Sequence, residues 1–294
     1  MASFTPIPSN PLSTVPSYQS FPFVSGFRQT VTGNSTFTMG PGCARALCNG
    51  NIIEFPNFTA GHAGITTVDV STVGVNGCFP VSIASLGLTQ NTLFPVYAIS
   101  NSSGTGPTAV NSLTGGTTNV TGPSYVVATG NNFLPPFYDT FVRVGYIFIA
   151  EATSFVIPWA QSGHGNEKTY ILQDPITGVS AGAATAAAII DLTSTVGVIP
   201  PNKNIEVILN VEITPNAAGG WVAVEPGSLT AGSVSPTQIF GSATAEPSSS
   251  QIRMIATPNA TTGDANIQYW VNNAGSSATI NVVGFVDSLG NALV

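Results

Sequence analysis

Hydrophobic and polar positions alternate most clearly in residues 205–213. All five odd-numbered positions carry Ile, Val or Leu, and three of the four even-numbered positions are polar, namely Glu206, Asn210 and Glu212. Successive side chains of a strand point to opposite faces, so this pattern places an apolar face against a core and a polar face in water. The segment is predicted to be a half-buried antiparallel strand.

Residues 133–150 show a different pattern, because apolar side chains occupy both faces of the predicted strand. A strand that needs cover on both faces is typical of the centre of a sheet. Pro135 and Pro136 precede the strand and are predicted to fix its entry, since proline restricts the backbone. Together with Arg143 and Gly145, these prolines are the predicted structural residues of the unit.

Arg143 is a charged side chain in the middle of this apolar run, in the sequence Phe-Val-Arg-Val-Gly-Tyr. An unpaired charge inside a protein is strongly disfavoured. Arg143 must therefore reach solvent at an edge or pair with an acid such as Asp139 or Glu151. The prediction is a structural ion pair or a contact with backbone carbonyl groups.

Short runs of β-type residues alternate with Gly, Pro, Asn and Ser turns along the rest of the chain. Predicted strands include residues 36–39, 51–55, 65–71, 92–101, 125–129, 220–225, 251–256, 267–272 and 279–286. Residues 178–190 are ambiguous, with strand favoured over helix. The spacing is typical of a sandwich or barrel, and a turn-rich sequence near Asp174 predicts a boundary. The expected fold is all-β, with two antiparallel, jelly-roll-like β-sandwich domains at residues 36–175 and 176–294.

Residues 1–35 are predicted to form an extended N-terminal arm, because proline at high density blocks both helix and ladder formation. The residues expected to anchor this arm are Phe4, Pro6, Pro8, Pro11, Tyr18, Phe21 and Phe23. Their aromatic rings are expected to dock on a neighbouring subunit or on the body of the chain. A disordered leader is the alternative, since termini are often untied.

Composition changes the picture in one respect, because only 6% of the residues are charged while 43% are hydrophobic. Surfaces of soluble monomers usually carry about 25% or more charged residues. A chain this poor in charge is predicted to cover much of its surface with copies of itself or with neighbours. A secreted polar β-protein is the alternative interpretation.

The net charge of −7 argues against binding to nucleic acid or to an anionic membrane, since six Lys and Arg cannot build a basic patch. No export signal or membrane-spanning run is recognised, and no membrane insertion is expected.

Candidate chemistry is sparse. Cys43, Cys48 and Cys78 lack metal-ligand spacing, and the two histidines, His62 and His164, lie outside any ligand-like cluster. No nucleophile-elbow, phosphate-loop or calcium-loop sequence occurs. The chain is therefore predicted to have no catalytic residues, no metal site and no cofactor, and not to be an enzyme.

Three tryptophans, Trp159, Trp221 and Trp270, offer the alternative of a platform for sugar rings. Aromatic residues in strands are more often part of a core, because they bury large apolar areas there. Trp159 and Trp270 are the candidate glycan-contact residues of this alternative.

Several segments, taken in order, resemble a group of tailed-bacteriophage virion proteins of the fibre, appendage or decoration type. The segments are residues 39–45 (Met-Gly-Pro-Gly-Cys-Ala-Arg), 49–53, 68–71, 74–77, 93–101, 134–146 and 281–287. The likeness covers most of the chain from about residue 37 onward, and its motifs are loose. Pro136-Phe137 stands where the group commonly has Gly, and Val142 stands where it commonly has Arg.

The resemblance implies a non-enzymatic structural component of a bacteriophage virion, assembled from copies of itself as a homotrimer and contacting other virion proteins. Such a protein is expected on the exterior of the tail or head, after synthesis in the host cytoplasm, and is expected to be anchored by its N-terminal arm. A host-glycan-binding adhesin is the first alternative, and a polysaccharide depolymerase is the second.

Overall fold

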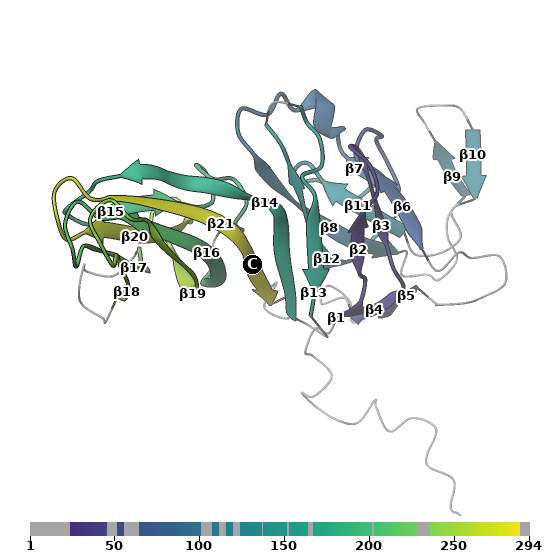
Figure 1. Cartoon of the computed structure of the whole chain (residues 1–294). Helices are drawn as coiled ribbons and strands as arrows, with labels where there is room; N and C mark the ends of the chain where they lie inside the picture. Colours follow the sequence, from purple (N-terminus) through teal and green to yellow (C-terminus); the bar gives the residue numbers. More distant parts are fainter. Residues whose placement is uncertain are drawn as a thin grey trace, which may run out of the picture.

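The computed structural model describes residues 24–45, 52–55, 65–100, 108–111, 116–119, 124–136, 138–151, 153–163, 167–201, 203–227 and 236–288. Strands dominate this part of the chain, and its single helical element is the short 3-10 helix η2 (Ile83–Ser85). The prediction of an all-β, sandwich-like fold is confirmed. Figure 1 shows the strands gathered into two neighbouring groups, each drawn mainly from one half of the sequence.

The second half of the chain builds one large antiparallel sheet. Its strands are β13 (Trp159–Ser162), β14 (Glu167–Gly182), β15 (Ala188–Asp191), β16 (Ile205–Thr214), β17 (Trp221–Pro226), β18 (Thr237–Phe240), β19 (Ser248–Pro258), β20 (Ala265–Val271) and β21 (Ser277–Ser288). Their order is β13-β14-β21-β16-β19-β20-β17-β18, with β15 also paired to β20.

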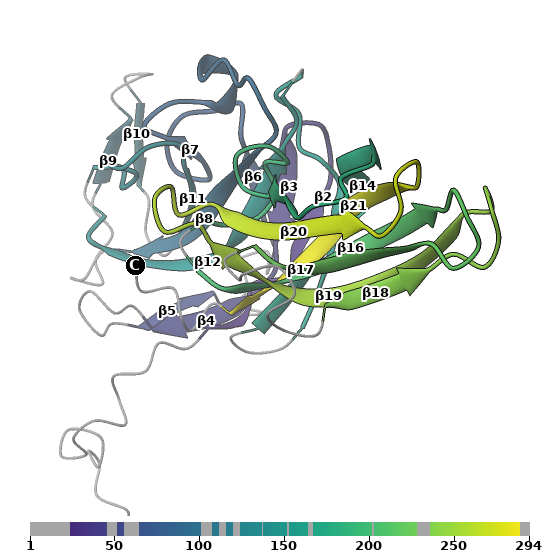
Figure 2. The same ribbon diagram turned by 90° about the vertical axis from the view of Figure 1, so that its left-hand side faces the viewer.

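This sheet folds back on itself at the β19–β20 hairpin, where only Thr257 and Pro258 pair with Asn266 and Ala265. The strands before the hairpin and those after it face each other across a common core. Inward-facing residues of β16, such as Val207 and Leu209, are fully buried there. The result is a curled sandwich (Figure 2).

The alternating segment forms β16 as predicted. The pattern places Ile205, Val207, Leu209, Val211 and Ile213 in the core, all 2% exposed or less. Glu206 pairs across the outer face with Arg253 of β19, at 3.3 Å between the charged groups. Both side chains are substantially exposed, so the pair contributes little to stability.

The first half of the chain forms several smaller sheets. Their strands are β1 (Val24–Gly26), β2 (Gln29–Val31), β3 (Thr36–Met39), β4 (Gly42–Arg45), β5 (Ile52–Phe55), β6 (Thr66–Asp69), β7 (Gly77–Phe79), β8 (Thr92–Ser100), β9 (Thr108–Asn111), β10 (Gly116–Asn119), β11 (Ser124–Ala128) and β12 (Thr140–Ile149). The sheets have the orders β1-β4-β5, β2-β3-β6, β12-β8-β11-β7 and β10-β9.

The apolar strand that follows Pro135 and Pro136 is β12, which begins at Thr140. The prediction of a sheet centre is wrong, because β12 is the terminal strand of its four-stranded sheet and pairs along its length only with β8. Nine of its ten residues are nevertheless buried. One face of β12 is covered by aromatic side chains of β13, β14 and β21, so double-sided burial comes from packing between sheets rather than from two hydrogen-bonded neighbours.

The predicted domain boundary between residues 175 and 176 falls inside β14. This strand pairs with β21 on both sides of that point, through Ile171 with Gly284 and Ile176 with Val282. A single buried cluster also joins residues of both halves, including Phe37 and Val207.

The N-terminal boundary differs as well, because β1 and β2 already belong to the body, with Val24 and Phe27 fully buried. The predicted arm therefore ends before residue 24, and the seven arm residues named above lie outside the described residues.

Candidate functional site

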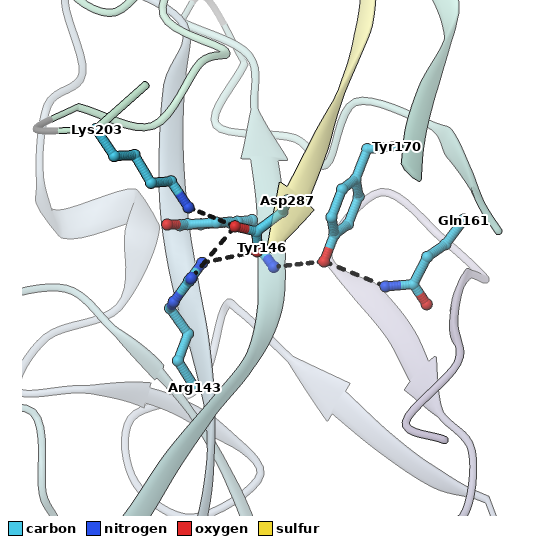
Figure 3. A network of polar contacts seen from close by, with 6 residues as sticks. All are labelled: Arg143, Tyr146, Gln161, Tyr170, Lys203 and Asp287. Carbon is cyan, nitrogen blue, oxygen red and sulfur yellow. Dashed lines mark hydrogen bonds and ion pairs between the residues drawn. The ribbon is translucent and has the colours of Figure 1, made fainter. Parts of the chain in front are cut away.

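Arg143 and Asp287 form a buried ion pair between the two halves of the chain (Figure 3). Arg143 lies on β12 and Asp287 lies near the end of β21, 144 residues away. The guanidinium donates from Nη1 to Oδ2 at 2.8 Å and from Nη2 to Oδ1 at 3.2 Å. This two-point geometry fixes the direction as well as the distance of the contact.

A β-bulge in β12 aims Arg143 at its partner. The pairing of β12 with β8 shifts between Arg143 and Gly145, which leaves Val144 without a register partner on β8. The extra residue lets the guanidinium lie over the ring of Tyr146, 4.4 Å from its centroid. Bulges redirect side chains in this way, and the ring adds a cation–π contact to the ion pair.

Lys203 brings a second cation to Asp287. Its ammonium donates to Oδ1 of the same carboxylate and lies 5.9 Å from the centre of the Tyr146 ring. Burial lowers the pKa of Lys203, while attraction to Asp287 opposes the shift and repulsion from Arg143 adds to it. Burial also works against the charge on Arg143, but Asp287, Tyr146 and Tyr170 together outweigh it and raise the pKa of that guanidinium. One carboxylate therefore holds two cations inside the protein.

Tyr170 of β14 extends the polar network towards the first half of the chain. Its hydroxyl accepts hydrogen bonds from the backbone N–H of Tyr146 at 3.2 Å and from Nε2 of Gln161 at 3.1 Å. Oε1 of Gln161 accepts from the backbone N–H of Gln29, on β2, at 2.8 Å. The chain of contacts thus joins β12, β14, β13 and β2.

Gly145 leaves the space that this network needs. A Cβ atom at residue 145 would lie 2.6 Å from Nε2 of Gln29 and 2.7 Å from the hydroxyl oxygen of Tyr170. Both distances are shorter than a normal contact, and Tyr170 is fully buried. Glycine is required at this position because of the close approach of two other elements.

Lys168 ties the start of the body to β14. Its ammonium donates to the carbonyl oxygens of Gly26 and Phe27, each at 2.8 Å, and the side chain is buried. Burial lowers the pKa of Lys168 to about 8, with attraction to Asp287 acting in the opposite direction. The contact fixes the chain immediately after residue 24.

The contacts of this cluster hold the two halves of the chain together. It is called here the structural bracket, and its members are Arg143, Tyr146, Gln161, Tyr170, Lys203 and Asp287. Both oxygens of the Asp287 carboxylate accept from cations and the side chain is fully buried, so neither oxygen is open to a substrate. Elsewhere, burial raises the pKa of the Cys78 thiol to about 12, which keeps it protonated and weakly nucleophilic at neutral pH. Within the described residues, no three His, Cys, Asp or Glu side chains come together as a metal site would require.

The prediction of an ion pair for Arg143 is confirmed, but its partner is Asp287 rather than Asp139 or Glu151. Pro135 and Pro136 lie in a turn four to five residues ahead of β12, and the Pro135 carbonyl accepts from the N–H of Tyr138 at 3.2 Å.

The two candidate glycan-contact tryptophans lie in different environments. Trp159 cannot contact a glycan, because it is 7% exposed and packs on Phe37 and Phe148 in the core. Trp270, by contrast, is half-buried on the outer face of β20.

Sequence reasoning missed Lys168, Lys203 and Tyr170 as members of the cluster. Lys168 carried a weak signal, since it occupies the same strand face as Tyr170 and Leu172, which are apolar or aromatic. Lys203 follows the sequence Pro-Pro-Asn and carried no such signal. His62, His164 and Cys48 lie outside the described residues.

In the part of the chain that the structure describes, no helix is long and apolar enough to cross a membrane. No protein-family model matches the chain, and no curated protein matches it by sequence. Among solved structures, it is similar to a Bacillus thuringiensis Cry1Da tryptic core variant, with a TM-score of 0.22 and 6% identity. The match covers 90% of this chain and 51% of that one, so the chain spans about half the length of that tryptic core. A likeness this weak carries no argument.

Proposed function

We propose that this chain is a non-enzymatic structural component of a bacteriophage virion. It assembles with copies of itself as a tail fibre, a tail appendage or an exterior decoration protein, and residues 1–23 anchor it to its neighbours. The proposal rests on the sequence resemblance described above, which also implies a trimer, and on the distribution of charge in the folded chain.

The distribution of basic side chains is the observation that supports assembly most directly. The chain has six Lys and Arg residues. Three of them, Arg143, Lys168 and Lys203, belong to the interior cluster around Asp287. The outer surface therefore has even fewer cations than the composition implies, and water-facing positions are filled largely by Ser, Thr, Asn and Gly. With only 6% charged residues, much of the surface is uncharged, and uncharged surface is readily covered by neighbouring molecules.

The bracket suits a part that must keep its shape within a larger assembly. Ion pairs and hydrogen bonds from β12, β13, β14 and β21 fix the two halves of the chain at one place. A buried network of ion pairs and hydrogen bonds of this kind favours one arrangement of the elements that it joins.

Particles of the phage that encodes this chain provide the test. The chain is expected among the proteins of purified, nuclease-treated particles, and immunogold labelling is expected on the exterior of the head or tail. Particles that lack the chain, although infected cells contain it in quantity, would contradict the proposal. A chain without residues 1–23 is expected to fold but to be lost from particles.

A further inference from the structure

A line of apolar side chains crosses the outer face of the sandwich. It consists of Ile189 on β15, Trp270 on β20, Trp221 on β17 and Phe240 on β18, and is called here the apolar row. These four strands are neighbours in the order β15-β20-β17-β18. The row therefore runs from one edge of this layer to the other.

Strand register places these residues on one face. Trp221 is directly opposite Phe240, and Trp270 is directly opposite Ala223, which shares a face with Trp221. Ile189 is opposite Gln268, two residues from Trp270 on β20. Each member of the row is thus a direct or diagonal neighbour of the next, within reach of a large side chain.

The apolar row is not part of the core. The alternate residues of the same strands, such as Val222, Tyr269 and Val271, fill the core on the other side of the layer. In the row itself, Phe240 is 58% exposed and Ile189 is 53% exposed, while Trp221 and Trp270 are half-buried. Large apolar side chains grouped on an outer face are typical of interaction sites.

Residues 1–23 have the complementary chemistry. They carry no acidic or basic side chain, and Pro16, Tyr18, Phe21, Pro22 and Phe23 fall within their last eight positions. Proline-rich segments are already extended before they bind, so they lose little conformational entropy on binding. They bind to surfaces lined with aromatic rings.

The dimensions also agree. Four adjacent strands span three interstrand spacings, about 15 Å. In an extended proline-type helix, at about 3.1 Å per residue, the five steps from Tyr18 to Phe23 span about the same distance.

We propose that the apolar row receives residues 16–23 of a second copy of this chain. This inference rests on the proposed self-assembly and names the surface that the arm would use. Segment 16–23 continues directly into Val24 on β1, which pairs with β4. In both Figure 1 and Figure 2, β4 lies well away from β18, towards the opposite end of the molecule. Eight residues span at most about 28 Å, so a neighbouring molecule is the better-placed host.

Photo-crosslinking of the full chain tests the proposal. Phe21 is replaced by p-benzoylphenylalanine, and equal amounts of unlabelled and nitrogen-15-labelled protein are mixed, irradiated, digested and analysed by mass spectrometry. Residue 21 is expected to crosslink to peptides of β17, β18 or β20, with the two peptides of each pair drawn from differently labelled copies in about half of the cases. In a Phe240→Ser, Ile189→Ser protein, the yield of this crosslink is expected to be at least fivefold lower.

The double variant Phe155→Ser, Ile65→Ser is the matched control. These residues are 46% and 61% exposed and lie outside the row, so the crosslink should persist. Pairs drawn only from identically labelled copies would show that the arm binds its own chain and would overturn the proposal. Crosslinks to other strands, or crosslinks unchanged by Phe240→Ser, would overturn it too.

Two further measurements separate this inference from the proposed function. Sedimentation velocity on the same samples shows whether the chain self-associates. Oligomers without a crosslink at the row overturn only the docking surface, whereas monomers at every concentration contradict self-assembly itself. Loss of the crosslink on addition of purified host polysaccharide, with a shift of the Trp270 NMR signal, would assign the row to glycan binding instead.

Discussion

The two halves of the chain reach the same fold class in different ways. In the part of the chain that the structure describes, the strands between residues 24 and 151 form four separate small sheets, whereas those between residues 159 and 288 form one sheet of nine strands. The second half has long, paired strands such as β16 and β21, whose alternate side chains face a core that the two halves share. The first half has smaller sheets, and one face of its strand β12 is covered by aromatic rings that belong to the second half.

This difference shows why the polar bracket lies where it does. An interface between two sets of strands has no continuous ladder of backbone hydrogen bonds to set the register between them. Arg143, Asp287 and Tyr170 supply directional contacts at this interface. Aromatic packing alone would permit more than one arrangement, because it is less directional than paired charges.

Removal of the Asp287 carboxylate, which both cations share, is expected to have the largest effect on the stability of the packing between the two halves. Asp287→Ala leaves Arg143 and Lys203 as buried or partly buried cations without their anion, and it should lower the free energy of unfolding by about 3–5 kcal/mol. Urea denaturation measures the change. Asp174→Ala, at an exposed position of β14, is the matched control and should change stability by less than about 0.5 kcal/mol.

Replacement of Arg143 and Asp287 together tests whether the loss of stability in Asp287→Ala comes from unpaired charge. Arg143→Met, Asp287→Met removes the buried ion pair and should recover part of the stability lost in Asp287→Ala, because the desolvation cost of Arg143 disappears together with its attraction to Asp287, while the partly exposed Lys203 still lacks its anion. If the single and double variants were equally unstable, the bracket would act through shape rather than through charge.

Gly145→Ala is expected to have the next largest effect. The added methyl group meets Gln29 and the Tyr170 hydroxyl at less than 3 Å, so the bulge or the network must shift, at a cost of about 1–3 kcal/mol. Thermal unfolding should show this loss. Gly178→Ala is the control, since its nearest neighbour would lie at an ordinary 3.4 Å. Equal melting temperatures for the two variants would count against the packing of Tyr170 on Gly145.

The smallest expected effect concerns pH. The pKa of Lys168 is about 8 in the folded chain and near its ordinary 10.5 when unfolded. Between these values the unfolded chain binds more protons, so stability should rise with pH. From pH 7.5 to 9.5, the free energy of unfolding should increase by about 1–2 kcal/mol relative to Lys168→Met. Denaturation curves at several pH values measure this difference, and a constant difference would mean that folded Lys168 stays protonated.

Much of the local structure was predictable because it depends on short-range rules. The alternation at residues 205–213 gave β16 correctly, since the period of two is a property of any strand with one buried face. The apolar run gave a buried strand at β12 but the wrong place in its sheet. Apolar side chains report that a face is covered, and they do not report whether a neighbouring strand or another sheet covers it.

The two candidate tryptophans also differ in a way that only the fold decides. Trp159 and Trp270 were equivalent candidates in the sequence, each within a short β-type run. In the fold, Trp159 faces the core beside Phe148, while Trp270 faces outward from β20. The direction of each ring depends on which face of its strand packs against another layer. The residues around Trp159 and Trp270 do not indicate which face that is.

The sequence alone determined the all-β class, the strand at residues 205–213 and the need of Arg143 for a partner, because alternation, turn residues and the cost of a buried charge act locally. The tertiary structure decided that the partner is Asp287, 144 residues away, that Lys203 shares it, and that Gly145 makes room for Tyr170. These contacts join strands that are distant along the chain. The physical reason is that their geometry exists only after two sheets have packed together.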